Sequence, residues 1–376
     1  MNSRIFHLIK KEFIQAIRDP RMLFIILVAP IIQLVILGYV ATTEVKNISL
    51  AIYDQDRSFY SEKLIDKFKG SPYFKIKHYV FSPKETQRLI DSGMAKIALR
   101  IENGFGKDIQ HSNLAPVQVI FDGSDSNSAI VSSGYVSSIM EGFSGEVVKE
   151  RLYSKGIDIE SFGSLQNKTR VWFNEELKSS NYVVPGIVAM LLLIDTMILA
   201  ALAIVKEKEY GTLEQLIVTP IKPYELLVGK MVPYVIITYI EIILSILVAV
   251  FWFKVPFRGS FVLLLLLLMI FLLPTLGIGL FISLISRTQY QAFLTAFLVM
   301  FPMIMLSGFI YPIQNMPKVI QLFTYLLPLR YFLEIVRGIF LKGIGLKYLW
   351  KEVWPLLILG SSIFILSVSM FRKKLS

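Results

Sequence analysis

The stretch Lys206-Glu-Lys-Glu-Tyr-Gly-Thr-Leu-Glu-Gln-Leu-Ile-Val-Thr-Pro220 separates two long apolar runs, Tyr182–Val205 and Leu226–Phe253. Each run is long enough to cross a membrane as a helix, which takes about 20 residues, so we expect the charged stretch to be the tip of a membrane hairpin. Its mixed charged and apolar residues favour a short amphipathic helix within residues 206–225. A tip that exposes apolar side chains is expected to dock on a partner, and a solvated tip without a partner is the alternative.

Four more apolar runs reach spanning length, which gives six in all. The chain is 54% apolar with a mean hydropathy of +0.60, above the roughly 45–50% apolar content of soluble proteins. The absence of cysteine excludes disulfides, thiolate metal sites and a cysteine nucleophile. The predicted fold class is therefore an α-helical polytopic membrane protein with six transmembrane helices. The four further runs are Met22–Val40, Phe261–Ile285, Ala292–Ile310 and Val353–Phe371.

Residues 1–21 are predicted to form a cytoplasmic amphipathic helix that connects to a first span at residues 22–41. Phe6, Ile9 and Phe13 share one face of this helix, which would lie in the membrane interface as a passive anchor or as a lever. The run that follows is longer than the core of a secretory signal, which has about 7–15 residues, and no clear cleavage site follows it. We therefore expect the first span to be retained.

The basic residues predict the orientation of the spans. The net charge is +11, and residues 42–180 are neutral with 18 Lys/Arg and 18 Asp/Glu, so the surplus belongs to the membrane part. Both ends of the chain and the 206–225 segment are rich in Lys and Arg, which places both termini in the cytoplasm and the chain in the inner (plasma) membrane. Six Lys/Arg within residues 311–352 run against this pattern. No basic stripe with interleaved aromatic residues indicates nucleic-acid binding.

Residues 42–180 are predicted to form an extracytoplasmic α/β domain inserted between the first two spans. Strands that alternate with helices favour this class, and about 140 residues can bury a core. The predicted strands are Ile48–Tyr53, Lys75–Phe81, Lys96–Ile101 and Val117–Phe121. The predicted helices are Ser58–Lys69, Pro83–Ser92, Gly104–Gln110 and Ala129–Tyr153. Four carboxylates after the strands suit turn hydrogen bonds better than a metal site: Asp54, Asp56, Asp122 and Asp125.

Polar side chains inside the predicted spans are candidates for a transport path. Asp195 and Glu241 lie midway through the second and third spans, and Gln33 lies in the first. Intramembrane carboxyl groups are costly and indicate function by default. The alternatives are hydrogen bonds between helices or a protonated group that faces a wet cleft.

The fifth span is followed by a segment, residues 311–350, that is only partly apolar. It contains Pro312, Pro317 and Pro328, so short helices that enter the membrane and return fit it best. A cap over a central path would be its functional role. Arg330, Glu334 and Arg337 share a helical spacing that predicts ordinary ion pairs. The spans therefore group into a five-helix transmembrane domain over residues 181–376.

No stretch of the chain fits a nucleotide-binding loop. Gly104-Phe-Gly106-Lys107-Asp108 lacks the spacing and the Ser/Thr of that loop, and no nucleophile elbow or zinc-protease motif occurs. We assign no catalytic residue, cofactor or metal to the chain. ATP, if it is used, must be bound by another protein.

Motifs along the whole chain resemble the ABC-2 family of ATP-binding-cassette exporter permeases, in the branch with a large domain between the first two spans. The most specific match is the 206–225 segment, in which Gly-Thr, Glu-Gln and Thr-Pro stand in register. The residues that carry the resemblance are Lys10-Lys11-Glu12-Phe13 with Arg18-Asp19-Pro20-Arg21, Tyr182-Val-Val-Pro185-Gly186, Glu207-x-Glu209-x-Gly211-Thr212-x-Glu214-Gln215-Leu216 with Thr219-Pro220, Gly229-Lys230 with Pro233, and Leu306-Ser-Gly308-Phe-Ile-Tyr-Pro312 with Arg337-Gly338.

The resemblance implies a permease subunit that pairs with a second permease, identical or paralogous, and with two cytoplasmic ATPase subunits that hold ATP and magnesium. A periplasmic adaptor and membrane lipids are further partners to consider, and an amphipathic or lipid-like substrate is expected. An ATP-independent sensor or channel and a proton-coupled secondary transporter are the alternatives. The residues implied to contact the ATPase are Glu207, Glu209, Gly211, Thr212, Glu214, Gln215, Thr219 and Pro220.

Overall fold

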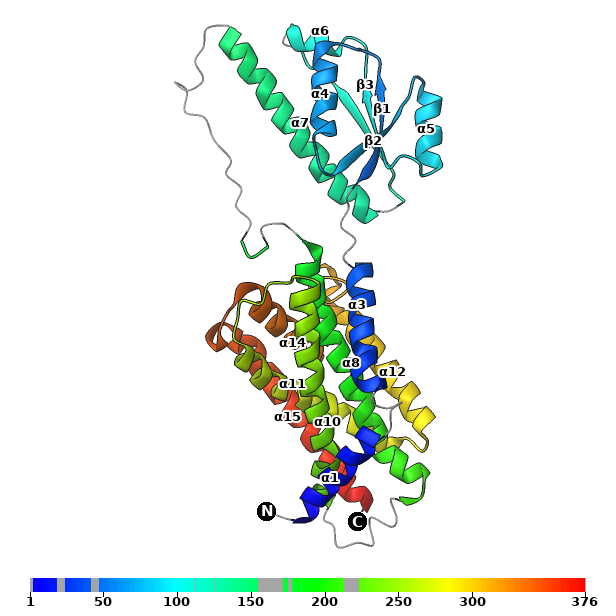
Figure 1. Ribbon diagram of the computed structural model, residues 1–376, viewed down its shortest axis with the longest axis vertical. Coiled ribbons are helices and arrows are strands. Elements are labelled where there is room, and N and C mark those ends of the chain that lie inside the picture. Colours follow the sequence, from blue (N-terminus) through cyan, green and yellow to red (C-terminus); the bar gives the residue numbers. More distant parts are fainter. Residues whose placement is uncertain are drawn as a thin grey trace. The chain divides into compact units, whose positions relative to one another are not determined.

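The computed structural model describes residues 3–18, 24–41, 47–111, 113–124, 126–154, 172–174, 178–212 and 223–375. The chain divides into two compact units (Figure 1). A helical unit comprises Met1–Thr43 and Arg170–Ser376, and an α/β unit comprises Glu44–Thr169.

The α/β unit is built on a four-stranded sheet of order β2-β1-β3-β4. Strand β1 is parallel to both β2 and β3, and β4 is antiparallel to β3. The predicted strands and helices of this segment are found within a few residues of their expected bounds. The strands are β1 (Ile48–Asp54), β2 (Phe74–Tyr79), β3 (Ile97–Ile101) and β4 (Val117–Phe121), and the helices are α4 (Phe59–Lys69), α5 (Pro83–Asp91), α6 (Phe105–Gln110) and α7 (Ser126–Ser154).

Helices cover both faces of this sheet. Leu50 and Ile52 of β1 point to the face covered by α4, α6 and α7, whereas Ala51 and Tyr53 point to the face covered by α5 (Figure 1). This alternation follows the two-residue period of a strand. Ser58 and Ser82 cap α4 and α5 by accepting hydrogen bonds from Ser61 and Glu85 backbone N–H groups, which fixes where each helix begins.

The helical unit contains five described helices that are long and apolar enough to span a membrane. A bent pair, α13 (Lys318–Thr324) with the stretch 328–342, makes a sixth candidate if it counts as one span. The predicted first span instead appears as a π-helical turn, Phe24–Val28, followed by the shorter apolar helix α3 (Ala29–Ala41). The five candidate spans lie in α8 (Ser179–Glu209), α10 (Pro223–Leu247, with the π turn Val248–Trp252), α11 (Phe261–Ile285), α12 (Gln289–Leu306) and α15 (Leu346–Leu375).

Helix α8 is the central element of the helical unit. It is the most buried of the five candidate spans, and it contacts α3, α10, α11, α12 and α14 (Pro328–Arg337). A Cβ added to Gly279 of α11 would lie 2.5 Å from the Ala200 side chain of α8. The close approach of these two helices therefore requires a residue without a side chain at position 279.

The segment after α12 folds into short helices. They are the 3₁₀ turn Ile313–Asn315, α13 (Lys318–Thr324), α14 (Pro328–Arg337) and the π turn Gly338–Lys342. The chain bends by 79° between α13 and the stretch 328–342.

The ion pairs predicted within α14 are wrong. The Arg337 guanidinium lies 3.8 Å from the centre of the Tyr182 ring, and Arg330 lies 4.0 Å from the Tyr325 ring. Neither arginine pairs with Glu334, which is exposed. Aromatic faces next to both arginines provide cation–π contacts that the helical spacing alone does not reveal.

Candidate functional site

The 206–225 segment begins as the last turn of α8. Lys206–Glu209 continue that helix without a break, so the predicted separate amphipathic helix does not start at Lys206. The chain turns at Gly211, whose φ of +70° suits glycine. Glu214, Gln215, Thr219 and Pro220 lie outside the described residues.

Beside this turn, a buried lysine joins three helices. Lys230 of α10 is only 3% exposed, and its Nζ lies 2.8 Å from Glu207 Oε1 of α8 and 3.0 Å from Glu12 Oε1 of α1 (Ser3–Arg18). The Thr212 hydroxyl donates a hydrogen bond to the second oxygen of Glu207. We call these four residues the ion cluster. A charge buried this deeply is tolerable only with such partners, so the cluster fixes the end of α8 to α1 and α10.

Close packing of α1 on α10 brings the members of the ion cluster within reach of each other. A Cβ added to Gly229 would lie 2.3 Å from the Leu8 side chain of α1. The dipeptide Gly229-Lys230 thus has two structural roles. The glycine allows α1 to approach α10, and the lysine binds the Glu12 carboxylate of α1. The sequence analysis quoted both residues but did not predict this contact, because Glu12 and Lys230 lie 218 residues apart.

The opposite side of the same helix end is bound to the end of α11 and to the first residue of α12. Glu209 Oε2 accepts hydrogen bonds from the Gln289 backbone N–H at 2.8 Å and from its side chain at 3.0 Å. Lys208 Nζ donates to the Ser286 carbonyl at 2.8 Å. Glu207 and Glu209, implied contacts of an ATPase, are therefore each engaged within their own chain.

Midway along α8 and α10, the structure brings together the two intramembrane carboxyl groups. Asp195 and Glu241 lie side by side, although 46 residues separate them in sequence. Glu241 is 1% exposed. Gln33 is exposed on α3 and forms no hydrogen bond with either carboxyl group, so the structure unites two of the three candidate path residues.

Comparison with known proteins shows the family of the chain. The family described as "ABC-2 family transporter protein" matches residues 20–371. The chain belongs to the ABC-2 family. The permease is 32% identical to the "Probable multidrug ABC transporter permease YbhR" of Escherichia coli K12 over 374 residues, which cover all of both chains.

Two further relatives from the same organism match nearly the full length of the permease. It is 35% identical to the "Probable multidrug ABC transporter permease YbhS" over 342 residues, which cover 90% of this chain and 89% of that one. It is 27% identical to the "Inner membrane transport permease YhhJ" over 373 residues, which cover 98% and 97%.

Two of the carboxylates that follow the strands of the α/β unit, Asp54 and Asp122, form turn hydrogen bonds, as predicted. Asp54 accepts hydrogen bonds from the backbone N–H groups of Asp56 and Arg57. Asp56 accepts two more, each at 2.8 Å, from Gly104 and Gly106. Burial alone would raise the pKa of Asp56, but the hydrogen bonds from Ser58 and the two glycines lower it overall.

The third carboxylate, Asp122, is engaged in the same way. Its salt bridge with Lys96 at 2.6 Å, together with hydrogen bonds from Ser124, lowers its pKa to about 2. Asp125 lies outside the described residues. Within the described ranges no group of three or more potential ligands is arranged to hold a metal.

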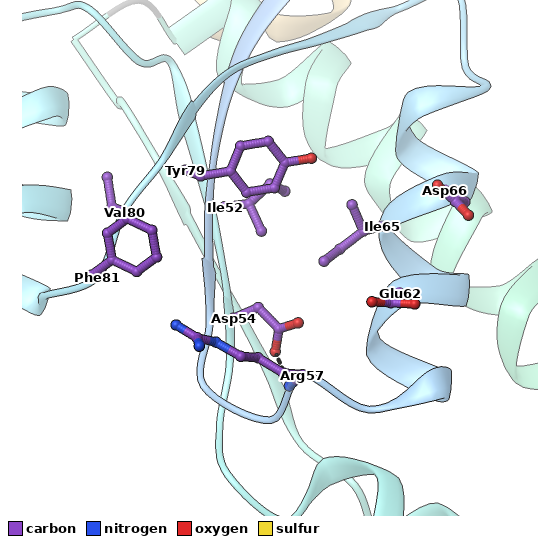
Figure 2. A pocket seen from close by; sticks show the side chains of 9 residues that line it. All are labelled: Ile52, Asp54, Arg57, Glu62, Ile65, Asp66, Tyr79, Val80 and Phe81. Carbon is purple, nitrogen blue, oxygen red and sulfur yellow. Dashed lines mark hydrogen bonds between the residues drawn. The ribbon is translucent and has the colours of Figure 1, made fainter.

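A cavity of about 510 Å³ opens in the α/β unit of the permease, at the ends of β1 and β2 next to α4 (Figure 2). Its size is within the range of small-molecule sites. Three carboxylates and one arginine line it, so it would favour a cation over an anion. The lining residues are Ile52, Asp54, Arg57, Glu62, Ile65, Asp66, Tyr79, Val80 and Phe81.

Proposed function

We propose that this permease is the membrane subunit of an ATP-driven exporter that receives a push at the cytoplasmic end of α8 and opens a path across the membrane. ATP and magnesium are bound by two separate ATPase subunits. The observation that carries the proposal is the ion cluster. It joins the start of the 206–225 segment to α1 and α10 through Glu207 and Lys230.

The ion cluster supports the transmission of force because it is costly to break. Removing one partner of a buried ion pair costs about 3–5 kcal/mol, so α1, α8 and α10 move together at this end. The bonds of Glu209 to Gln289 connect the start of α12 to the same group of helices. A displacement at Gly211 is therefore transmitted to several spans. A hairpin tip without these bonds would move without displacing the neighbouring helices.

The remaining parts follow from this role. In this proposal six spans cross the inner membrane, and both termini lie in the cytoplasm. The α/β unit lies on the extracytoplasmic side, and residues 311–350 form a re-entrant cap. A second permease, identical or paralogous, completes the path, and the α/β unit is the place where a periplasmic adaptor would bind. The basic flanks of the spans and the family's ATP-binding-cassette partnership support this assembly.

The substrate we propose is amphipathic or lipid-like: a drug, a lipid or a glycolipid. Two relatives carry "multidrug" in their names. Asp195 and Glu241 give the path an acidic point between α8 and α10.

Two variants test transmission separately from docking. Glu214→Lys with Gln215→Ala should abolish co-purification of the ATPase, because these residues belong to the implied contact. Lys230→Met should keep the ATPase bound but lose ATP-driven transport in proteoliposomes. Lys63→Met, which removes a partly exposed surface lysine of the α/β unit, is the control. Transport that survives in Lys230→Met, or in vesicles without any ATPase, would refute the proposal.

The carboxyl pair of Asp195 and Glu241 leaves one alternative function, a proton-coupled secondary transporter. That function predicts transport driven by a proton gradient without ATP and lost in Asp195→Asn. Dependence on ATP alone would exclude it.

A further inference from the structure

The carboxyl pair of Asp195 and Glu241 lacks the partners that buried charges require. Both oxygens of Glu241 and Oδ2 of Asp195 are shielded from solvent and accept no hydrogen bond from a donor in the described part of the chain. The Ser245 hydroxyl, one helical turn beyond Glu241, is equally buried and has no hydrogen-bond partner among the described residues. Ionised carboxylates only accept hydrogen bonds, so two of them side by side cannot satisfy each other.

Among the described residues, no positive charge on a neighbouring helix compensates the pair. Helices α3, α11 and α12 carry no charged residue. On α14, Arg330 and Arg337 cover aromatic rings and Glu334 is exposed. The charged residues of α15 lie near its two ends, and among the described members of α1, Glu12 and Lys11 face the ion cluster.

We propose that Asp195 and Glu241 bind one proton, which the two carboxyl groups share while α8 and α10 are packed as they are here. Two adjacent carboxylates in an apolar interior repel each other and lose their hydration. One shared proton removes a charge and supplies the missing hydrogen-bond donor. When α8 and α10 part and water enters, the proton passes to water and both groups ionise.

The proton site and the ion cluster hold the same two helices at separate levels. Asp195 lies 12 residues from Glu207 on α8, and Glu241 lies 11 residues from Lys230 on α10, about 17 Å at 1.5 Å per residue. A push that separates α8 from α10 must therefore disrupt the shared proton as well. This link to transport rests on the proposed function, whereas the proton site itself does not.

Infrared spectroscopy of the full-length permease in lipid nanodiscs tests the site without ATP or substrate. The wild type at neutral pH should show the C=O band of a buried, protonated carboxylic acid. The band should shift in Asp195→Asn and in Glu241→Gln and disappear in the double variant. Glu150→Gln, an exposed carboxylate of the α/β unit, is the control and should leave the band unchanged.

A second measurement needs no variant, in case the double substitution fails to fold. Dicyclohexylcarbodiimide modifies protonated carboxyl groups in apolar surroundings, and mass spectrometry should find its adduct on Asp195 or Glu241 of the wild type. Wild-type protein with neither the band nor the adduct would overturn the proton site while leaving ATP-driven transport intact. Loss of ATPase binding or of ATP dependence would refute the proposed function alone.

Discussion

The two units of the permease use lysine–glutamate pairs in opposite ways. In the α/β unit, Lys63 and Lys67 of α4 pair with Glu150 and Glu146 of α7 at the surface. In the helical unit, Lys230 is enclosed by two carboxylates from two other helices. Removing one partner of such a pair is therefore expected to change the free energy of unfolding little in the α/β unit and strongly in the helical unit. The reason is that burial removes the water that would otherwise replace the lost partner.

The largest expected effect follows from removing the buried lysine. Lys230→Met leaves Glu12 and Glu207 close together with only the half-exposed Lys11, 3.8 and 4.0 Å away, as a cation, which should destabilise the helical unit by about 3 kcal/mol, the lower end of the range for a broken buried pair. Thermal unfolding of the purified permease, followed by size-exclusion chromatography, measures the loss. Reversing the pair with Lys230→Glu and Glu207→Lys should recover part of it. An unchanged unfolding temperature in Lys230→Met would show that the ion cluster contributes nothing.

Glycines give a second contrast between the units. Gly279→Ala should destabilise the helical unit by about 1–3 kcal/mol, since its new methyl group would meet Ala200 of α8 at 2.5 Å. Gly142→Ala in α7 has open space around its Cβ and should stabilise that helix by about 0.4–1 kcal/mol. The unfolding temperatures of the two variants should move in opposite directions. A shift of the same sign would contradict the close approach of α8 and α11.

The sequence predicts elements better than it predicts the site. Ile48–Asp54 and Val117–Phe121 were found because an apolar or alternating run between turn residues identifies a strand wherever its partners lie. The contacts of Lys230 with Glu12 and of Asp195 with Glu241 depend on how distant helices pack, and no local pattern encodes that.

Neighbours in space also explain the wrong prediction. The spacing of Arg330 and Glu334 permits an ion pair, but the aromatic rings of Tyr325 and Tyr182 were invisible to an argument along one helix.

Acid should reveal the contribution of Asp122 in the α/β unit. Its folded pKa of about 2 lies below the ordinary value of 3.8, so the carboxylate stabilises the fold above about pH 4 and loses this effect as the pH falls through 2. Asp122→Asn should therefore speed amide hydrogen exchange in β3 and β4 at pH 6, measured in the full chain. At the lower end of the pH range, wild type and variant should converge. A difference that persists there would assign the effect to packing instead.

The smallest expected effect belongs to the exposed pair, which makes it the sharpest control for the buried one. Lys63 and Glu150 keep 24% and 50% of their side-chain surface in solvent, so water replaces either partner, and Lys63→Met should change stability by no more than about 1 kcal/mol. Added salt should reduce even that difference, because exposed charges are screened over about 10 Å at 0.1 M. Added salt should change the effect of Lys230→Met less, since only 3% of the Lys230 side chain is exposed to solvent. Equal salt sensitivity in the two variants would mean that water and ions penetrate to Lys230. The buried and the exposed ion pairs would then differ only in the size of their contribution to stability.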